Sequence, residues 1–596
     1  MTARKWTFVP FDVAAVQELS RQADVSPVVA QLLLRRGIEQ PDLARQFLEA
    51  KLTSLRPPEE LPGVPRACEL ISAAIDAGHE MVVHGDYDAD GMTGTAILYR
   101  CLQLLGARVT YFLPNRMEEG YGLHVDSIDK FAKAGKKMVI TVDCGVAGIE
   151  AAKRAKELGL QLVVTDHHRF ADQLPEADVI VHPALPGANY PFAGLCGAGV
   201  AFKLAWALCQ MRTGATRVTD RLREFLLQAV GLAAIGTVAD VVPLVDENRI
   251  IVRNGLKMLL KHSSLGLKRL RELTGLTKKQ TLESEDIGFT IAPRLNAAGR
   301  LGQAQLAVEL LITEDDTRAT SLARYIEELN ENRNKLERSM HLSASKQLKE
   351  THSLDEDPAF ILSSPNWHPG VIGIVAGKLA EKYHRPVIMI AMDKLGVKPA
   401  VGSGRSPNGV NLHEALQQCR ELLVSGGGHA AAAGLKVEES QLSAFRAAFM
   451  EAVAEQAANA QRIAELSFDA EAALGQLDLH TLLQIEQLSP FGMQNARPLF
   501  CAIGVKMVDA PRLLGDSGKH LSMQLIQHGK RMRAVAFGQG EEWFEKLLAV
   551  GDQPIDLAFR PVINDHNGFR AVEIHLVDWR MHEPQATSRN TLQSVG

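Results

Sequence analysis

The residues best suited to chemistry lie in one short segment, HGDYDADG at residues 84–91, which directly follows an apolar run. Asp86, Asp88 and Asp90 crowd one turn there, close to His84. Carboxylates this close repel one another in a crevice, so divalent cations are their natural counter-charge. Asp and Gly are also common in ordinary turns, so the segment alone supports a plain loop about equally well.

Three later segments each place an acid or an imidazole at the end of an apolar run. They are TVDCG with Asp143, TDHH with His167 and His168, and GTVADVVP with Asp240. If the runs are parallel strands, their carboxyl ends meet at one edge of a sheet, where ligands bind in such folds. Mixed imidazole and carboxylate ligands suit Mn²⁺ or another borderline metal, whereas Mg²⁺ prefers oxygen alone. Two metals bridged by a carboxylate promote in-line attack of water on a phosphate ester, so the pattern predicts phosphoryl hydrolysis.

These residues need a sheet to hold them, and the region from about residue 80 has the pattern of one. Short apolar runs alternate with helical stretches, which predicts an α/β fold with a parallel sheet and crossover helices. The apolar stretch at residues 225–239 is shorter than the ~20 residues of a membrane span, so we expect a buried helix or strand pair there. The expected strands are residues 81–84, 109–113, 138–142, 162–165 and 179–181.

The rest of the chain divides into segments that differ in composition and hydrophobic periodicity. One charged stretch without Pro or Gly repeats apolar residues at helical spacing, which predicts a long connecting helix. Strand-like runs with glycine-rich loops follow it, and then a β texture with a hairpin signal, NG at residues 567–568. The expected parts are an N-terminal extension (1–60), a catalytic α/β domain (61–314), the connecting helix (315–350), a second α/β domain (351–460), a β-barrel (461–582) and a flexible tail (583–596).

Length, composition and charge exclude several classes of protein. The chain has 596 residues, 46% hydrophobic and 23% charged, which indicates a globular protein of several domains and excludes a disordered or fibrous one. Its 65 Lys and Arg against 70 Asp and Glu give a net charge of −5, so any surface for nucleic acid must be local. Residues 253–279 hold eight Lys and Arg and one acid, which fits either a stripe along a phosphate backbone or a solvated helix face.

The cysteines and the N-terminus indicate the compartment. Seven cysteines without a C-x-x-C pair disfavour a disulfide framework, a zinc ribbon and a thioredoxin-like site. The first residues lack the apolar segment of a signal peptide. We therefore expect a cytoplasmic protein without membrane association.

The four metal-site segments, with GSGRS at residues 402–406 and GGGHAAAAG at 426–434, resemble the motifs of the DHH superfamily of phosphoesterases. The superfamily is named for the motif that stands here at residues 166–168. From about residue 60 to 580, the order and spacing resemble the superfamily's single-strand-specific 5′→3′ DNA exonucleases. The resemblance implies a two-lobed core with a parallel sheet, a long connecting helix, a second α/β domain and a C-terminal oligonucleotide-binding (OB-like) barrel.

The resemblance also implies a role for each residue of these motifs. Asp143 would bridge two divalent cations, Mn²⁺ in preference to Mg²⁺, and would be a catalytic group. Asp166 would orient its neighbours without binding metal. His168 would face the scissile phosphate and stabilise its developing charge. The metal ligands implied are His84, Asp88, Asp90, Asp143, His167 and Asp240.

Further residues match the DNA-contacting segments of the superfamily. A guanidinium group binds phosphate through two parallel hydrogen bonds, so Arg116 is a candidate for holding the 5′-terminal phosphate. In the barrel, bases would stack on aromatic residues beside basic ones, and Phe537, Phe559, Arg531, Arg533 and Arg560 are candidates. The other nucleic-acid-binding residues implied are Arg294, Asn296, Arg300, Arg405, Ser406 and His429, the last three in glycine-rich loops.

The function implied is a metal-dependent exonuclease that digests single-stranded DNA 5′→3′, releases 5′-mononucleotides and acts in recombination and repair. Its partners would be single-stranded DNA, a single-stranded-DNA-binding protein and a helicase. Two alternatives stay open. One is a phosphoesterase for small substrates such as pyrophosphate, a cyclic dinucleotide or short RNA, for which the barrel would be superfluous. The other is a catalytically inactive replication scaffold, which would not need the full set of ligands.

Overall fold

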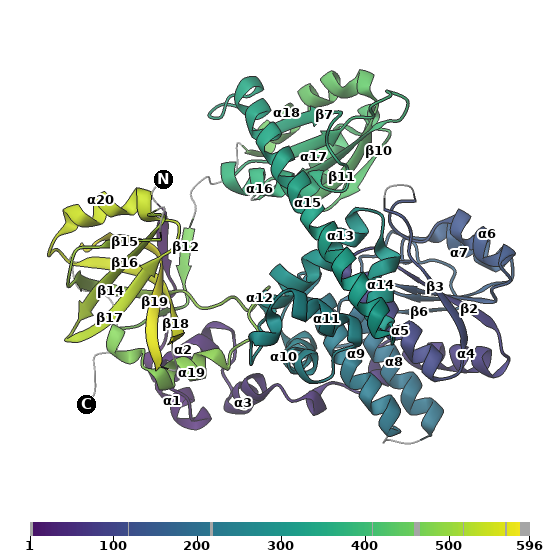
Figure 1. The fold of residues 1–596 in the computed structure, drawn as a ribbon, viewed down its shortest axis with the longest axis horizontal. Helices are drawn as coiled ribbons and strands as arrows, with labels where there is room; N and C mark the ends of the chain where they lie inside the picture. The colour runs from purple at the N-terminus through teal and green to yellow at the C-terminus, as the bar shows by residue number, and fades with distance from the viewer. Residues whose placement is uncertain are drawn as a thin grey trace. The chain divides into compact units, whose positions relative to one another are not determined.

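The chain folds into two compact units (Figure 1). Unit 1 combines Met1–Leu55, Pro243–Arg253 and Ile463–Gly596, and unit 2 combines Arg56–Val242 and Asn254–Arg462. The computed structural model describes residues 4–116, 119–214, 218–407, 409–457, 465–515, 518–566 and 569–583.

Unit 2 begins with a five-stranded, all-parallel sheet in the order β3-β2-β4-β5-β6, which confirms the predicted parallel α/β fold. Each strand lies within two residues of its predicted bounds, because short apolar runs of three to six residues mark these parallel strands clearly. The strands are β2 (Glu80–Gly85), β3 (Arg108–Phe112), β4 (Met138–Val142), β5 (Gln161–Thr165) and β6 (Val179–Val181).

Helices cover both faces of this sheet. On one face Val82, Val139 and Leu162 pack against Phe131 and Ala152, which belong to α6 and α7. On the other face α5 and α8 contact the strands and pack against α9. Helix α9 is long and apolar enough to cross a membrane, but most of it is buried inside unit 2, so it is a core helix. The helices are α4 (Val64–Asp76), α5 (Ala89–Leu104), α6 (Val125–Lys133), α7 (Ile149–Glu157), α8 (Gly197–Thr213) and α9 (Asp220–Ala239).

A group of helices then leads to the connecting helix α15 (Asp316–Thr351), which lies within one residue of its predicted bounds. The Asp315 side chain caps α15 by accepting a hydrogen bond from the Arg318 amide at 2.7 Å. The preceding helices are α10 (Asp246–Lys261), α11 (Leu265–Leu273), α12 (Ser284–Asp286), the π-helix η4 (Ile287–Ile291), α13 (Ala292–Arg300) and α14 (Ala304–Ile312).

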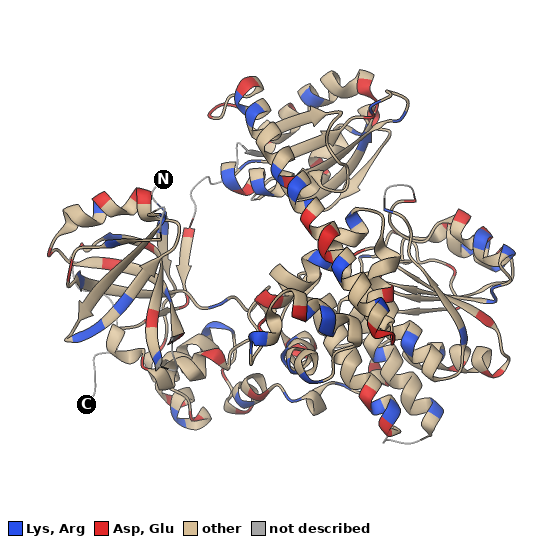
Figure 2. Cartoon of the chain, in the orientation of Figure 1, with Lys and Arg blue, Asp and Glu red and all other residues tan. Residues whose placement is uncertain are grey.

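Some cations of the basic run at residues 253–279 are engaged within the fold, whereas Lys257, Lys261, Lys268 and Lys278 are exposed. Arg269 pairs with Asp316 at 2.6 Å, and Lys279 with Asp286 at 2.7 Å. Arg271 is buried and donates to the Leu259 carbonyl. Lys and Arg are interspersed with Asp and Glu along these helices in Figure 2. Part of the charge run therefore stabilises helix packing, and its exposed lysines fit either a stripe along a phosphate backbone or a solvated helix face.

The second α/β domain of unit 2 contains a mixed sheet in the order β10-β11-β9-β8-β7. The glycine-rich segments that we expected to be loops form strands β9 and β10, because β11 pairs antiparallel with each of them. The elements are β7 (Phe360–Ser364), α16 (Ile372–Tyr383), β8 (Val387–Ala391), β9 (Ala400–Arg405), α17 (Leu412–Gln418), β10 (Ser425–Gly428), β11 (Ala432–Val437) and α18 (Leu442–Ala457).

Unit 1 contains a seven-stranded sheet in the order β13-β14-β18-β19-β17-β16-β15, which a β14–β16 pairing closes into the predicted barrel. Phe559, a candidate stacking residue, is fully buried against Phe500 at a ring distance of 6.0 Å, whereas Phe537 is exposed. The hairpin signal at 567–568 and residues 584–596 of the expected tail lie outside the described residues. The elements are β13 (Ala470–Glu471), α19 (Leu479–Glu486), β14 (Phe500–Met507), β15 (Arg512–Leu514), β16 (His520–Gln527), β17 (Lys530–Ala536), α20 (Gly540–Val550), β18 (Ile555–His566) and β19 (Phe569–Met581).

The N-terminal residues, expected only as an extension, are part of the barrel unit. Leu19 and Leu33 share one hydrophobic core with Leu521 and Ile574 of the barrel. Strand β1 pairs in parallel with β12, the strand that leads into the barrel. The elements are β1 (Lys5–Phe8), α1 (Val13–Ala23), α2 (Pro27–Arg35), α3 (Pro41–Glu49) and β12 (Glu465–Phe468).

The segment Pro243–Arg253, which the sequence assigned to the catalytic domain, also belongs to unit 1. Arg249 is 2% exposed and donates to the carbonyls of Phe47, Leu488 and Gln487. Its guanidinium carbon lies 3.7 Å from the centre of the Phe47 ring. Burial, with Arg253 and Arg36 nearby, lowers the pKa of Arg249 to about 9. This arginine joins three distant segments through backbone carbonyls, a role that no local pattern indicates.

Candidate metal centre

Two helix N-termini hold the carboxylates that follow β2. Asp88 is the N-cap of α5, and its Oδ1 accepts hydrogen bonds from the amides of Asp90 and Gly91 at 2.9 and 3.0 Å. Asp90 accepts from the amides of Gly197 and Ala198, at the start of α8, at 2.7 and 2.9 Å. The positive ends of two helix dipoles therefore face these acids.

Asp143 follows β4 in a strained conformation. Its φ of 62° lies in the left-handed region, which non-glycine residues rarely adopt. Helix α8 approaches it so closely that a Cβ at Gly197 would lie 2.5 Å from the Asp143 Cβ. Backbone strain and a tight neighbour thus fix the direction of a carboxylate that is almost fully buried.

Asp166 lies behind the two histidines and orients them. Its Oδ1 accepts from the His167 amide at 2.7 Å and lies 2.8 Å from His168 Nδ1, while its Oδ2 accepts from the Val146 amide at 3.0 Å. Burial alone would raise the pKa of Asp166, but His168 and these amides hold it below its ordinary value. Burial lowers the pKa of His168, but Asp166 outweighs this effect and raises it to about 9.

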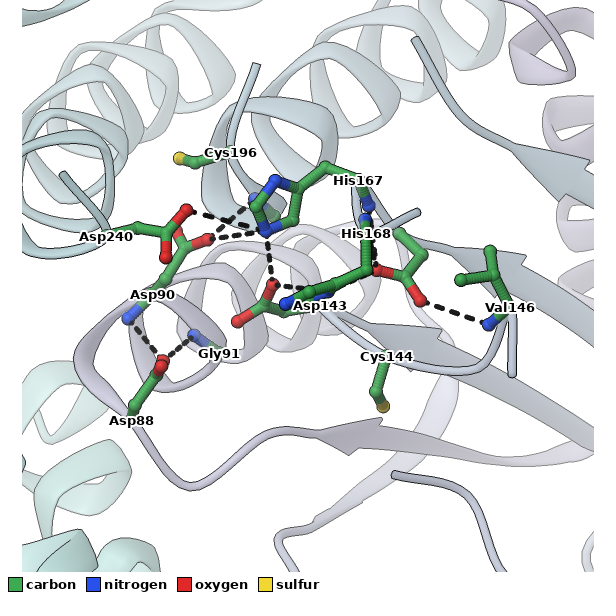
Figure 3. A network of polar contacts seen from close by, with 12 residues as sticks. Asp88, Asp90, Gly91, Asp143, Cys144, Val146, His167, His168, Cys196 and Asp240 are labelled. Carbon is green, nitrogen blue, oxygen red and sulfur yellow. Dashed lines mark hydrogen bonds and ion pairs between the residues drawn. The ribbon is translucent and has the colours of Figure 1, made fainter. Parts of the chain in front are cut away.

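The remaining ligand candidates converge on His167 (Figure 3). Its Nε2 atom lies 3.0 Å from Asp143 Oδ1, 3.5 Å from Asp240 Oδ2 and 3.8 Å from Asp90 Oδ2. Three groups have ligand atoms within 4.8 Å of one another: Asp86, Asp88 and Asp143; Asp90, His167 and Asp240; and Asp143, His167 and His168. Since Asp143 belongs to the first group and lies beside the second, it is placed to bridge two cations.

The chemistry of these donors fits divalent cations. Among the described residues, Asp86 Oδ1, Asp143 Oδ1 and His167 Nε2 are buried without a hydrogen-bond partner. Burial lowers the pKa of His167, which favours the neutral imidazole that binds metal. Burial and neighbouring carboxylates raise the pKa of Asp143 well above its ordinary value, and that of Asp240 to about 8. Buried acids that repel one another in this way need protons or metal ions between them.

His84, an expected ligand, does not join these groups, and Asp86 does. The His84 ring packs 5.6 Å from Phe112 and 5.9 Å from Phe131, on the face of the sheet that also buries Val82. Alternation along β2 puts residues 82 and 84 on that face, whereas Asp86 lies beyond the strand end and turns toward the ligands. The signal for Asp86 was present in HGDYDADG, but choosing between the two residues required knowing where β2 ends.

Some of the expected DNA-contacting residues are engaged within the protein, and others have no side-chain partner among the described residues. Arg294 pairs with Glu327, and Asn296 Oδ1 accepts from the Ala89 amide at 2.9 Å, so both are engaged within the protein. His429 lies exposed in the turn between β10 and β11, and Ser406, just after β9, is buried with an unpaired hydroxyl among the described residues. The structure therefore does not present Arg294 as a free cation for phosphate.

Three other arginines, Arg116, Arg300 and Arg405, lie close enough for the charge of one to affect the pKa of another. Burial, followed by the charges of Arg116, Arg405 and Arg333, lowers the pKa of Arg300 to about 10. Burial and then Arg116 lower the pKa of Arg405. The guanidinium carbon of Arg116 lies 5.0 Å from the centre of the Tyr87 ring. In the chain, Tyr87 stands between the candidate ligands Asp86 and Asp88. Cations that repel one another beside a metal centre form a ready site for an anion.

Models of known protein families match three parts of the chain. The DHH family N-terminal domain matches residues 80–237, the DHHA1 domain matches residues 356–455, and the RecJ OB domain matches residues 468–578. The first match contains every residue of the metal centre except Asp240.

Curated relatives match nearly the whole chain. The single-stranded-DNA-specific exonuclease RecJ of Bacillus subtilis is 36% identical over 98% of this chain and 71% of its own length. The enzyme of the same name from Escherichia coli is 32% identical over 93% of this chain and 95% of its own. A crystal structure of RecJ in complex with Mn²⁺ from Thermus thermophilus matches with a TM-score of 0.81 and 33% identity, covering 98% of this chain and 81% of that one. The chain therefore belongs to the RecJ family.

Proposed function

We propose that this protein is a metal-dependent exonuclease that digests single-stranded DNA from the 5′ end and releases 5′-mononucleotides. The proposal rests on one observation. Asp143 Oδ1 and His167 Nε2 are buried and lie 3.0 Å apart, and the two residues belong to adjacent groups of candidate metal ligands. The activity named for its relatives and the Mn²⁺ and Mg²⁺ in their crystal structures support it.

The two ligand groups would hold two divalent cations, Mn²⁺ or Mg²⁺. Asp86, Asp88 and Asp143 form one group, and Asp90, His167 and Asp240 form the other, with Asp143 beside both. When bound, such a pair supplies a water of lowered pKa and neutralises charge on the phosphate. His168, whose pKa is raised to about 9 by Asp166, would be cationic at neutral pH and face the scissile phosphate.

The arginine cluster would hold the 5′-terminal phosphate. Burial and then the charge of Arg116 lower the pKa of Arg300 and of Arg405, and an anion bound among the three would relieve that repulsion. Arg116 packs on Tyr87, inside the ligand loop, so a phosphate bound there would lie at a set distance from the metal ligands. A fixed spacing between end anchor and metals would release one nucleotide at a time.

The barrel would hold the strand beyond the cleaved nucleotide. Phe537 is 54% exposed and lies edge-on to His520 at 5.4 Å and to His575 at 4.9 Å. An exposed ring at the end of β17, the strand that carries Arg531 and Arg533, suits the stacking of unpaired bases. We also propose that a single-stranded-DNA-binding protein and a helicase deliver this substrate in the cytoplasm, and that the protein acts in recombination and repair.

The test is a time course on single-stranded DNA labelled at its 3′ end, with Mn²⁺, with Mg²⁺ and with chelator, beside a duplex and pyrophosphate. We expect a descending ladder of labelled fragments that requires metal and a free strand. Immediate release of labelled mononucleotide would reverse the polarity and remove the end-anchor assignment. Pyrophosphate hydrolysis without DNA cleavage would favour a small-substrate phosphoesterase, and inactivity on both substrates would favour a scaffold.

A further inference from the structure

Tyr121 lies beside the metal centre and contacts His168, the residue placed to face the scissile phosphate. Its hydroxyl oxygen lies 3.0 Å from His168 Nδ1 and 3.2 Å from the backbone oxygen of Asp143. The two rings meet edge to face, with their centres 5.4 Å apart. Tyr121 therefore joins His168 to the backbone of Asp143, the residue placed to bridge two cations.

The two contacts of the hydroxyl determine which ring nitrogen of His168 is engaged. A phenol has one proton to donate, and a carbonyl oxygen can only accept. Tyr121 therefore donates to the Asp143 carbonyl and accepts from His168 Nδ1. Asp166 Oδ1, which lies 2.8 Å from the same Nδ1, also accepts from it. Both contacts require the proton on Nδ1, and they leave Nε2 as the ring atom that can meet a phosphate oxygen.

The backbone of His168 is held without the help of Tyr121. The His168 amide donates to Asp166 at 3.1 Å. Buried His182 accepts from the Ala184 amide at its Nδ1 atom, so its Nε2 atom carries the proton and donates to the His168 carbonyl at 2.9 Å. Loss of the Tyr121 hydroxyl should therefore leave this segment in place and affect only the imidazole ring.

The loop that carries Tyr121 is anchored on both sides. The Glu119 amide donates to the Asn115 carbonyl at 2.8 Å, and the Asn115 amide donates to the Glu119 carboxylate at 2.7 Å. Leu123 is buried in the core that also contains Val82. The hydroxyl of Tyr121 is thus held in position by the fold, as a group that orients another side chain must be.

We propose that Tyr121 is a positioning residue, whose hydroxyl holds the His168 imidazole so that Nε2 faces the scissile phosphate. The side chain of His168 is 37% exposed, so packing alone does not fix its ring. The hydrogen bond to Asp166 leaves the ring free to swing about that contact, and the second contact removes this freedom. A group that stabilises developing charge is effective when it is oriented before the reaction. The proposal rests on the nuclease function proposed above.

The first experiment compares two variants on 5′-phosphorylated single-stranded DNA. Tyr121→Phe should lower kcat about tenfold or more and leave KM unchanged, because the hydroxyl contacts protein groups and not the substrate. Tyr121→Leu also removes the ring, which is 41% exposed. If the Phe variant matches the unchanged protein and only the Leu variant raises KM, the ring contacts DNA and the proposal is overturned.

Two measurements exclude a general disturbance of the centre. Mn²⁺ affinity, measured by calorimetry, should be unchanged in Tyr121→Phe, and a parallel loss of affinity and kcat would overturn the positioning role. The matched control is Tyr99→Phe in α5, which removes a hydroxyl that accepts from Gln103 at 2.8 Å. This control should keep the kcat of the unchanged protein, and an equal loss of kcat in both variants would overturn the proposal.

A double-mutant cycle tests whether Tyr121 acts through His168. His168→Ala removes the group that Tyr121 is proposed to orient, so adding Tyr121→Phe to it should lower kcat no further. Equal fold losses from Tyr121→Phe in both backgrounds would show that the hydroxyl acts independently of His168 and would overturn the proposal.

A spectroscopic readout tests the contact without catalysis. In full-length protein with ¹⁵N-labelled histidine and bound Mg²⁺, the His168 Nδ1 resonance is the one that His168→Ala removes. We expect Tyr121→Phe to move this resonance and Tyr99→Phe to leave it in place. An unmoved resonance, or additive losses in an active protein, would overturn this proposal. Failure of the nuclease proposal is distinct, because the unchanged protein would then digest no single-stranded DNA.

Discussion

His167 Nε2 and Asp143 Oδ1 lie 3.0 Å apart inside unit 2, and neither atom is satisfied by a hydrogen bond from another described residue. Since burial lowers the pKa of His167, its ring is neutral and both atoms can present lone pairs to the same point. Their positions are set by Asp166, which holds the histidine backbone, and by the left-handed backbone of Asp143.

Asp143→Asn should separate catalysis from DNA binding. Asn tolerates the left-handed φ of 62° better than Ala, so the fold should survive while one shared charge is lost. We expect hydrolysis of single-stranded DNA to fall by at least about 100-fold, because metal affinity and charge neutralisation both depend on this carboxylate. Filter binding in the presence of chelator should remain close to that of the unchanged protein. A parallel loss of binding and hydrolysis would contradict this division.

Gly197→Ala should disturb the same carboxylate from the side. A Cβ at position 197 would lie 2.5 Å from the Asp143 Cβ, and neither α8 nor the buried acid can easily move. We expect metal affinity, measured by calorimetry with Mn²⁺, to fall about 10- to 100-fold. The matched control is Gly199→Ala in the same helix, where the nearest atom is Leu195 Cδ2 at 3.4 Å. Equal effects at both positions would indicate a general disturbance of α8.

Metal binding should depend on pH in a direction set by Asp240. Burial and neighbouring acids raise its pKa from 3.8 to about 8, so between these values the native protein holds a proton that the unfolded chain releases. Without metal, the free energy of unfolding should therefore fall as pH rises through this window. A cation takes the place of that proton, so the rise in Tm on adding Mn²⁺ should be larger at pH 8 than at pH 6. An Asp240→Asn variant should show a smaller difference, because the pKa of Asp143 stays raised, and equal Tm shifts at both pH values in the unchanged protein would contradict the assignment.

Most of the centre could be predicted from the sequence, because buried parallel strands are continuous apolar runs and most of the acids follow them, although Asp240 follows helix α9. The choice between His84 and Asp86 could not, since it depends on which face each residue of β2 presents. Charge runs were equally ambiguous. Arg271 is buried among helices, yet nothing in the sequence distinguishes it from Lys268, an exposed cation of the same run.

Packing between segments far apart in the chain was the property that the sequence predicted least. Leu19 of α1 lies in one core with Ile574 of β19, although more than 500 residues separate them in the chain. Phe537 and Phe559 both looked like stacking residues, but only the barrel closure shows that Phe559 points inward. Such facts arise from pairing between distant segments, which composition and periodicity do not encode.

Arg116→Ala should change how the protein treats the 5′ end. If Arg116 helps to hold the terminal phosphate, its loss should slow digestion of 5′-phosphorylated strands about tenfold or more. Strands with a 5′-hydroxyl end should be affected much less, because they lack the anion that Arg116 would bind. Arg66→Ala, which removes an exposed arginine paired with Glu69, is the control. Equal slowing of both substrates would show that Arg116 does not recognise the end.

Phe537→Ala should weaken the hold on long strands while leaving the chemistry intact. The exposed ring between His520 and His575 offers a stacking surface, and a stacked base contributes about 1–3 kcal/mol, so KM for a long single strand should rise roughly fivefold or more. The kcat should hardly change, since Phe537 belongs to unit 1 and all the candidate metal ligands belong to unit 2. Phe537→Trp should restore KM because it keeps an aromatic face, and Leu513→Ala, which removes another exposed apolar side chain of the barrel, should leave KM unchanged. If the tryptophan variant behaves like the alanine variant, the contribution of Phe537 is packing and not base stacking.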